Sequence, residues 1–388
     1  MFSEFDRLAM TRALALAERG LETTHPNPRV GCVIAKGERI IGEGWHERAG
    51  EAHAEVVALR AAREPAAGAT AYVTLEPCRH HGRTPPCVNA LIEARIARVV
   101  FAVQDPNPRV SGQGAGALLR AGIAVEAGLM EGEATEINIG FMKRMKCGLP
   151  WVRVKLAMSL DGRTALANGA SQWITGEPAR DDVHRWRARS SAVMTGVGTV
   201  LADDPQLSVR APGFKGQQPL RVVLDGRLRS PPGARMFGGL GAAEGEVLIF
   251  TAAAPACAAS RVPVAVANTD LSPAALHARR TALTSRGARI EEIAADGGFL
   301  DLGAVLRKLG ELEVNEVLVE AGPTLAGQLL ATFQADELLL YIAPKLLGPQ
   351  ARPLVNLPEL QALQDAWSFA LFDAKRFGDD LRLRLRPK

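Results

Sequence analysis

Helical and strand-like patterns of apolar residues alternate along the first 128 residues. The pattern predicts a helix from Ser3, its cap, to about Arg19, a strand over residues 30–35 and a helix from about Ala52. A strand over 71–74, a helix after Cys87 and a strand over 98–103 follow. Such alternation is typical of an α/β layer.

The second half of the chain alternates in the same way. Strands are predicted over 151–156, 192–195, 220–224, 247–251 and 316–320, with helices between them such as 177–190 and a long loop over 230–245. The segment 143–150 combines a charge cluster, a Gly and a Pro just before a new strand. Because single cores stop growing near about 250 to 300 residues, 388 residues favour two domains, which we place at 1–146 and 147–388.

Composition and charge narrow the class of protein. Apolar residues make up 47% and charged residues 23% of the chain, as in an ordinary folded globular protein. The net charge of +4 is evenly spread, since 18 of the 46 basic and 17 of the 42 acidic residues lie in 1–146. No basic face for nucleic acid is implied. Without a signal-peptide pattern at the start or a run of about 20 apolar residues, we expect a cytoplasmic protein and no membrane span.

The strongest chemical signal is His53-Ala54-Glu55, followed by Glu76-Pro77-Cys78 and then Cys87. One imidazole and two thiolates suit a catalytic zinc ion whose fourth position stays open. In zinc deaminases a Glu two positions after the His is not a ligand but moves protons, and the cysteines follow a Pro. We therefore predict one zinc ion per chain on His53, Cys78 and Cys87, with Glu55 as the catalytic residue. Because residues i and i+2 lie about 200° apart on a helix, His53 should sit at or next to a helix N-terminus.

Other histidines and cysteines have plainer explanations. Five cysteines at low density are not a disulfide framework, and we assign Cys32 and Cys257 to packing. The adjacent His80 and His81 should point apart in a loop, which disfavours them as ligands. His46 is a better candidate for a residue that lines the pocket than for a metal ligand. Asn27, between two prolines, is either a turn residue or a hydrogen-bonding partner for a pyrimidine edge.

Several longer segments resemble one known family. In order, TTHPNPRVG, GWHERAGEAHAEV, YVTLEPCRHHGRTPPC and DPNPRVSGQG are similar to the deaminase half of the bifunctional deaminase/reductase of riboflavin biosynthesis. KLAMSLDGRTA, SQWITG, MTGVGTVLADDPQLSVR and VEAGPTLAGQLL resemble its reductase half. The resemblance covers roughly residues 5 to 350, and the eight residues between Cys78 and Cys87 match this branch rather than the shorter spacing of other deaminases. Ala52, Arg79 and the stretch that begins at Gly348 depart from the family pattern, and none of them is a predicted metal ligand.

The resemblance implies a fold and two reactions. The fold would be a cytidine-deaminase-like α/β/α domain followed by a dihydrofolate-reductase-like α/β domain. The first would hydrolyse an amine of 2,5-diamino-6-(5-phosphoribosylamino)pyrimidin-4(3H)-one. The second would use NADPH to reduce the ribosyl chain of 5-amino-6-(5-phosphoribosylamino)uracil to ribityl. A homo-oligomer is also expected.

The reductase half has no GxGxxG motif, but two glycine-containing turns follow predicted strands, and the second opens a helix suited to a pyrophosphate. The resemblance implies cofactor contacts from Ala157, Trp173, Thr199, Asp203, Gly322, Pro323, Thr324, Leu325, Ala326, Gly327 and Gln328. It implies substrate contacts from Ser171, Arg187, Leu207, Arg210 and Glu320. We expect Arg187 and Arg210 to hold the substrate phosphate, since a guanidinium presents a planar fork to its oxygens. Lys155 and Asp161 are further candidates for the proton or the ribose hydroxyls.

Two other functions compete with this interpretation. A nucleic-acid base deaminase with an accessory domain would share the zinc motif, but it predicts a basic surface and a short cysteine spacing. A non-enzymatic descendant would have lost Glu55 or a ligand, and all four residues are present.

Overall fold

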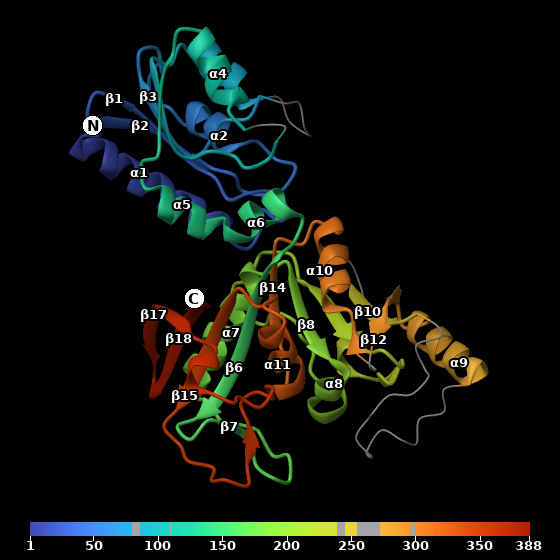
Figure 1. Ribbon diagram of the computed structural model, residues 1–388. Helices are drawn as coiled ribbons and strands as arrows, with labels where there is room; N and C mark the ends of the chain where they lie inside the picture. The colour runs from blue at the N-terminus through green and yellow to red at the C-terminus, as the bar shows by residue number, and fades with distance from the viewer. Residues whose placement is uncertain (80–85, 109–110, 239–244, 254–271, 297–298) are drawn as a thin grey trace. The chain divides into compact units, whose positions relative to one another are not determined.

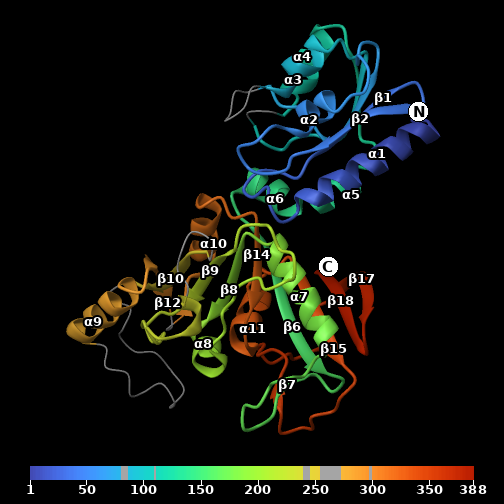
Figure 2. The same ribbon diagram turned by 180° about the vertical axis from the view of Figure 1, so that it is seen from behind.

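The computed structural model describes residues 1–79, 86–108, 111–238, 245–253, 272–296 and 299–388 (Figures 1 and 2). The chain divides into two compact units, Met1–Leu149 and Pro150–Lys388, with the division just beyond the predicted position at Lys146. No described helix is both long and apolar enough to cross a membrane.

The first unit is a five-stranded sheet with helices on both faces. The strands lie in the order β2 (Arg39–Trp45), β1 (Gly31–Lys36), β3 (Thr70–Leu75), β4 (Arg98–Val103) and β5 (Ala124–Ala127). β1 is antiparallel to both of its neighbours, whereas β3, β4 and β5 are parallel. The helices are α1 (Glu4–Ala17), continued by the 3₁₀ turn η1 (Glu18–Gly20), α2 (Ala54–Arg60), α3 (Cys87–Glu93), α4 (Gln113–Arg120), α5 (Glu131–Ile137) and α6 (Ile139–Cys147). One core joins α1, α5 and α6 to the sheet and another joins α2, α3 and α4, so the predicted α/β/α layering is confirmed.

Local sequence explains most of these elements. Ser3 caps α1 as predicted, because its side chain accepts from the Asp6 backbone while the Asp6 carboxylate accepts from the Ser3 backbone. The pattern missed β2, which contains Gly42 and Gly44. A Cβ atom on either would lie within 2.4 Å of the Ala58 backbone of α2. Close contact with the helix therefore requires glycine, and glycine weakens the strand signal.

The second unit has a nine-stranded sheet in the order β11-β10-β9-β8-β14-β6-β15-β18-β17. Its strands are β6 (Trp151–Ser159), β8 (Ala192–Gly196), β9 (Leu220–Leu224), β10 (Val247–Ala252), β11 (Ala288–Ile293), β14 (Glu316–Glu320), β15 (Glu337–Ala343), β17 (Phe369–Phe377) and β18 (Asp380–Pro387). Seven are parallel, and the hairpin of β17 and β18 adds an antiparallel edge. Two small ladders pair β7 (Arg163–Ala165) with β16 (Arg352–Pro353) and β12 (Ala295–Asp296) with β13 (Phe299–Leu300).

Helices connect these strands. They are α7 (Glu177–Arg189), α8 (Val197–Asp203), α9 (Pro273–Thr284), α10 (Leu302–Glu311) and α11 (Pro323–Ala331), with 3₁₀ turns η2 (Arg235–Phe237) and η4 (Leu363–Asp365). The predicted strands over 220–224 and 316–320 have the observed bounds. The predicted loop over 230–245 contains η2, and its residues 239–244 lie outside the described part. Because β6, β14 and β8 are adjacent and parallel, their carboxyl ends share one edge, where α8 and α11 begin (Figure 1).

A buried ionic network ties four neighbouring strands of this sheet together. Arg153 on β6 is fully buried and donates to Glu337 on β15 at 2.8 Å and to Glu316 on β14 at 3.0 Å. Arg384 on β18 donates to both oxygens of Glu337 at 2.9 Å. The Arg153 guanidinium also lies 4.4 Å from the ring centre of Trp186. Burial alone would raise the pKa of Glu337, but Arg153 and Arg384 outweigh it and hold the pKa at about 2.

Removing the central cation should destabilise the second unit. In Arg153→Leu, two carboxylates stay buried with fewer partners, and breaking a buried pair costs about 3 to 5 kcal/mol of unfolding free energy. Since Arg189, Arg384 and Arg386 still contact these carboxylates, we expect the lower end of that range. Urea unfolding followed by tryptophan fluorescence measures it, because four of the five tryptophans lie beyond residue 150.

The matched control is Arg376→Ala, which removes an exposed arginine that pairs with Asp379. It should leave the unfolding midpoint unchanged. Equal stability of Arg153→Leu and the wild type would mean that the network contributes nothing net.

Candidate active sites

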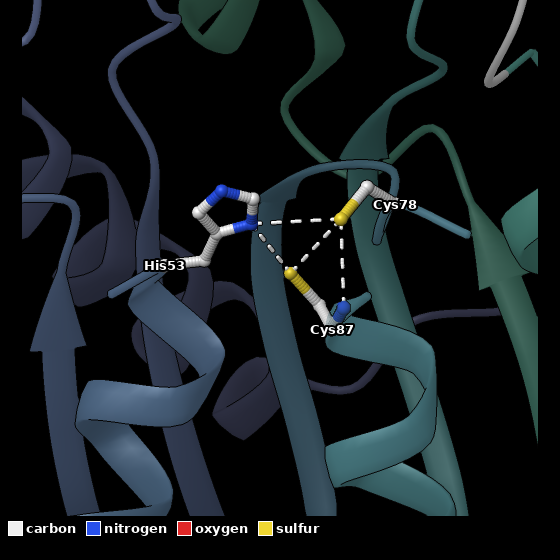
Figure 3. Close-up of side chains that lie close together, drawn as sticks. All are labelled: His53, Cys78 and Cys87. Atoms are coloured by element: carbon white, nitrogen blue, oxygen red, sulfur yellow. Dashed lines mark hydrogen bonds between the residues drawn. The ribbon is translucent and has the colours of Figure 1, made fainter. Parts of the chain in front are cut away.

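Three side chains from separate segments converge in the first unit (Figure 3). His53 is the N-cap of α2, as predicted, Cys87 is the first residue of α3, and Cys78 lies in the segment after β3. His53 Nδ1 lies 2.8 Å from the Cys87 sulfur and 3.5 Å from the Cys78 sulfur, and the two sulfurs are 3.3 Å apart. All three ligand atoms lie within 4.8 Å of one another. One imidazole nitrogen and two sulfurs at this spacing fit a zinc ion with an open fourth position.

The protonation states of the two thiols differ. Hydrogen bonds from Cys87 and His53 lower the pKa of Cys78 to about 4, although burial opposes the shift. Contact with the Cys78 sulfur, together with burial, raises the pKa of Cys87. One thiolate is therefore already present at neutral pH, and metal ligation favours the thiolate form of the other as well.

Glu55 lies beside these ligands on the first turn of α2. Its side chain is buried, and burial is the main reason that its pKa is raised, while the charge of His53 opposes the shift. A carboxyl group with a raised pKa holds a proton more readily than an exposed one, which suits a group that first accepts and then donates a proton.

A second pair of polar side chains lies next to the ligand set. Asn27 Nδ2 is 3.0 Å from His46 Nε2, and His46 Nδ1 is 3.1 Å from the Ala52 carbonyl oxygen. Since the carbonyl can only accept, His46 donates from Nδ1 and accepts from the Asn27 amide at Nε2. The His46 ring meets the His53 ring edge-on, with centres 5.5 Å apart. The structure thus brings Asn27 and His46 to the edge of the candidate metal site.

The sequence analysis gave no role to two carboxylates, Glu76 and Asp105. Glu76 accepts from the backbone N–H groups of Gly112 and Ala115 at 3.0 and 3.1 Å, which fixes the first turn of α4. Asp105 is buried, and burial raises its pKa to about 6. Each follows the end of a parallel strand, β3 or β4, and that position was the signal available in the sequence.

In the second unit, Arg187 on α7 and Glu320 at the end of β14 form a two-pronged ion pair. Arg187 Nη2 donates to Glu320 Oε2 at 2.9 Å, Nε donates to Oε1, and Nη1 donates to the Ser208 carbonyl at 2.9 Å. The fork that we expected to hold a phosphate is therefore bound to a carboxylate in this structure. Lys155 on β6 lies beside Glu320, and burial lowers the pKa of its amine.

The other expected substrate contacts differ in accessibility. Arg210 is exposed and Ser171 is partly exposed. Leu207 is 1% exposed and belongs to the core, so it presents almost no surface to a ligand.

The expected cofactor residues gather at the carboxyl edge of the sheet. Ala157 lies near the end of β6, Thr199 and Asp203 lie on α8, and Gly322 is the N-cap of α11. No side chain caps α11, and a Cβ on Gly322 would meet no atom within 4 Å, so its first turn is open to a ligand. Gly327 serves packing instead, because a Cβ there would lie 1.9 Å from the Asn356 carbonyl oxygen.

Trp173 presents an exposed ring near this edge. Its side chain is 63% exposed, and the Arg180 guanidinium lies 4.6 Å from the ring centre. Lys345, just after β15, donates to the Trp173 carbonyl at 3.0 Å and so holds the segment in place.

Asp161 does not suit a role in proton transfer. Its carboxylate accepts from the Ser159 hydroxyl and from the backbone N–H groups of Leu347 and Gly348. These bonds lower its pKa to about 2, so it stays ionised and fixes a turn. Cys32 is buried in the core, as predicted, whereas His80, His81 and Cys257 lie outside the described residues.

Comparisons with known proteins match both units. Residues 3–103 match the cytidine and deoxycytidylate deaminase zinc-binding region, and residues 150–383 match the RibD C-terminal domain. The chain is 48% identical over 391 residues to the riboflavin biosynthesis protein RibD of Escherichia coli, covering 98% of this chain and 99% of that one. It is similar to the structure of Acinetobacter baumannii RibD, at 43% identity, a TM-score of 0.86 and 99% of each chain.

A third relative is a diaminohydroxyphosphoribosylaminopyrimidine deaminase/5-amino-6-(5-phosphoribosylamino)uracil reductase from Thermotoga maritima. Its structure matches at 32% identity and a TM-score of 0.81, over 99% of each chain.

The convergence of His53, Cys78 and Cys87 predicts one zinc ion per chain, measured by elemental analysis of the purified protein. Cys78→Ala should lose the metal, because two remaining ligands seldom hold a zinc ion. Cys147→Ser, which changes an exposed cysteine, should keep a full equivalent. Equal zinc in Cys78→Ala and the wild type would exclude this ligand set.

Proposed function

This chain belongs to the RibD family of riboflavin biosynthesis proteins, a bifunctional deaminase and reductase, and we propose how its residues divide the two reactions. The first unit would release ammonia from 2,5-diamino-6-(5-phosphoribosylamino)pyrimidin-4(3H)-one. The second would reduce the product's ribosyl chain to ribityl. The observation that carries the proposal is the convergence of His53, Cys78 and Cys87 beside the buried Glu55.

In the deaminase unit the three ligands would hold a zinc ion, which when bound supplies a nucleophilic water at neutral pH. Glu55 would take a proton from that water and pass it to the departing amine, so that the ring carbon exchanges an amino group for a carbonyl and ammonia leaves. Burial of Glu55 favours its protonated state between these two transfers. Asn27, held by His46, would hydrogen-bond the pyrimidine edge.

In the reductase unit NADPH would supply the hydride. The open first turn of α11, with its dipole, is suited to the pyrophosphate. The residues from Gly322 to Gln328, together with Thr199 and Asp203 of α8, would surround the cofactor, while Ala157 and the exposed ring of Trp173 would contact it from the sheet edge. These roles rest on the shared edge of β6, β8 and β14.

The substrate of the reductase would lie beside the Arg187–Glu320 pair. Lys155, whose pKa is lowered by burial, is the nearby group best suited to give a proton to the sugar oxygen while the hydride reduces the carbon. Ser171 and Arg210 would complete the contacts. A nucleic-acid base deaminase would not account for the match of both units to RibD.

Glu55→Gln should keep zinc and lose deamination, because a positioned acid/base group contributes roughly 10² to 10⁴ in rate. Ammonia release from the diaminopyrimidinone measures the loss. Glu93→Gln, which changes an exposed carboxylate on α3, is the control and should retain full activity. A fully active Glu55→Gln variant, or one without zinc, would remove Glu55 from the proposed role.

A fragment that begins near Lys146 should fold and reduce the deaminated intermediate without binding zinc. The second unit has its own sheet and core, and separate cores need only a linker between them. NADPH oxidation, compared with that of the full chain, measures the activity. If soluble fragments from several start points fail to reduce the intermediate, the two units depend on each other.

A further inference from the structure

Two exposed arginines lie close together in the second unit. Arg210 follows the loop after α8, and Arg235 begins η2. Among the residues that the structure describes, neither guanidinium forms an ion pair, and Arg210 Nη1 donates only to the neutral Gln206 side chain at 2.9 Å. By contrast, Arg187 and Arg153 are paired with carboxylates.

The loop over residues 204–210, which carries Arg210, is held at successive positions. Arg187 binds the Ser208 carbonyl, and Gln218 bonds both the N–H and the carbonyl of Val209 at 2.7 and 2.9 Å. The backbone N–H of Arg210 itself donates to His184 Nδ1 at 3.2 Å. The buried side chain of Leu207 anchors the middle of the loop in the core. An exposed loop held in this way presents its guanidinium in a fixed place.

Arg235 is held by Asp204, the first residue of the loop over residues 204–210. Its backbone N–H donates to the carboxylate of Asp204 at 2.8 Å. The next two residues, Met236 and Phe237, are buried in the core and fix the short turn. Thus one loop positions the backbones of both arginines, while their charged ends remain exposed.

The charges around Arg210 are mutually repulsive. Burial, and then the positive charges of Arg187 and Arg235, lower the pKa of Arg210, while Glu320 only partly opposes this. Glu320 is already bound to Arg187. His184 is neutral at pH 7, because burial and the positive charges of Arg187 and Arg210 lower its pKa to about 4. A ligand with two negative charges would relieve the repulsion, and guanidinium pairs suit phosphate oxygens.

We propose that Arg210 and Arg235 bind the phosphate monoester of the reductase substrate, and that His184 is a positioning residue that holds Arg210. The inference rests on the proposed reductase function and assigns Arg235 and His184 to it. Arg187 is then not a phosphate contact, because its guanidinium is bound to Glu320. Two guanidinium groups suit a phosphate, and the 2′-phosphate of NADPH is the other source of one in the same reaction.

The test uses the full-length protein and two forms of the substrate. Arg235→Ala should raise the KM for 5-amino-6-(5-phosphoribosylamino)uracil roughly tenfold, the effect of about 1.4 kcal/mol, with kcat little changed. With the dephosphorylated substrate the variant and the wild type should have the same kcat/KM, which also shows that the variant is folded. Arg307→Ala, an exposed arginine on α10, is the matched control and should behave as the wild type.

Kinetics with NADPH and with NADH distinguish the substrate phosphate from the 2′-phosphate of the cofactor. If Arg235→Ala raises the KM for NADPH but not for NADH, the site binds the cofactor phosphate and the proposal is wrong. It is equally wrong if the variant loses the same factor on both forms of the sugar substrate. A wild-type protein that reduces neither form would instead refute the proposed reductase function itself.

Two variants test the role of His184. His184→Leu removes the acceptor for the Arg210 N–H and should raise the KM for the phosphorylated substrate several-fold. His184→Gln can accept the same hydrogen bond through its amide oxygen and should restore most of the affinity. If both variants match the wild type, or if Gln is as impaired as Leu, His184 does not position Arg210.

Discussion

The chemistry of the first unit depends on one constraint: a metal ligand set needs three side chains from distant segments at a single point. Two helices begin at this point, and the residues at their starts supply two of the three side chains. His53 caps α2, Cys87 opens α3, and Cys78 lies just beyond the parallel strand β3. Glu55 then falls on the first turn of α2, near the ligands but buried, where its pKa is raised. The short HAE motif thus places both a candidate ligand and the proposed proton carrier.

In the second unit, residues from distant segments are also brought together, but by a parallel sheet rather than by helix starts. Parallel strands bring their carboxyl ends to one edge, so the residues after β6, β8 and β14 become neighbours without any local motif. The network around Arg153 joins β6 and β14 to β15 and β18 away from that edge. Buried charges fix the sheet, whereas the charges at its carboxyl edge include Arg210 and Arg235, which remain without anions among the described residues. A negatively charged ligand can therefore pair only with the arginines at the carboxyl edge.

Sequence alone predicted what depends on local pattern. The metal ligands, the position of His53 at a helix start and the bounds of β9 and β14 followed from motif and periodicity. β2 was missed, because the glycines that allow α2 to approach also weaken the strand pattern. The Arg187–Glu320 pair could not be foreseen, since its partners are 133 positions apart. The same holds for the contact of His184 with Arg210, which depends on how a loop folds back on α7.

The most direct test of two chemistries on one chain is to follow the wild-type protein with the phosphoribosylated diaminopyrimidinone and identify its products by mass. Without NADPH, we predict that the deaminated uracil and ammonia accumulate and that the ribosyl chain stays unreduced. With NADPH, the ribityl product should replace the uracil. Recovery of unchanged substrate in both reactions, from protein that holds a full equivalent of zinc, would contradict the account.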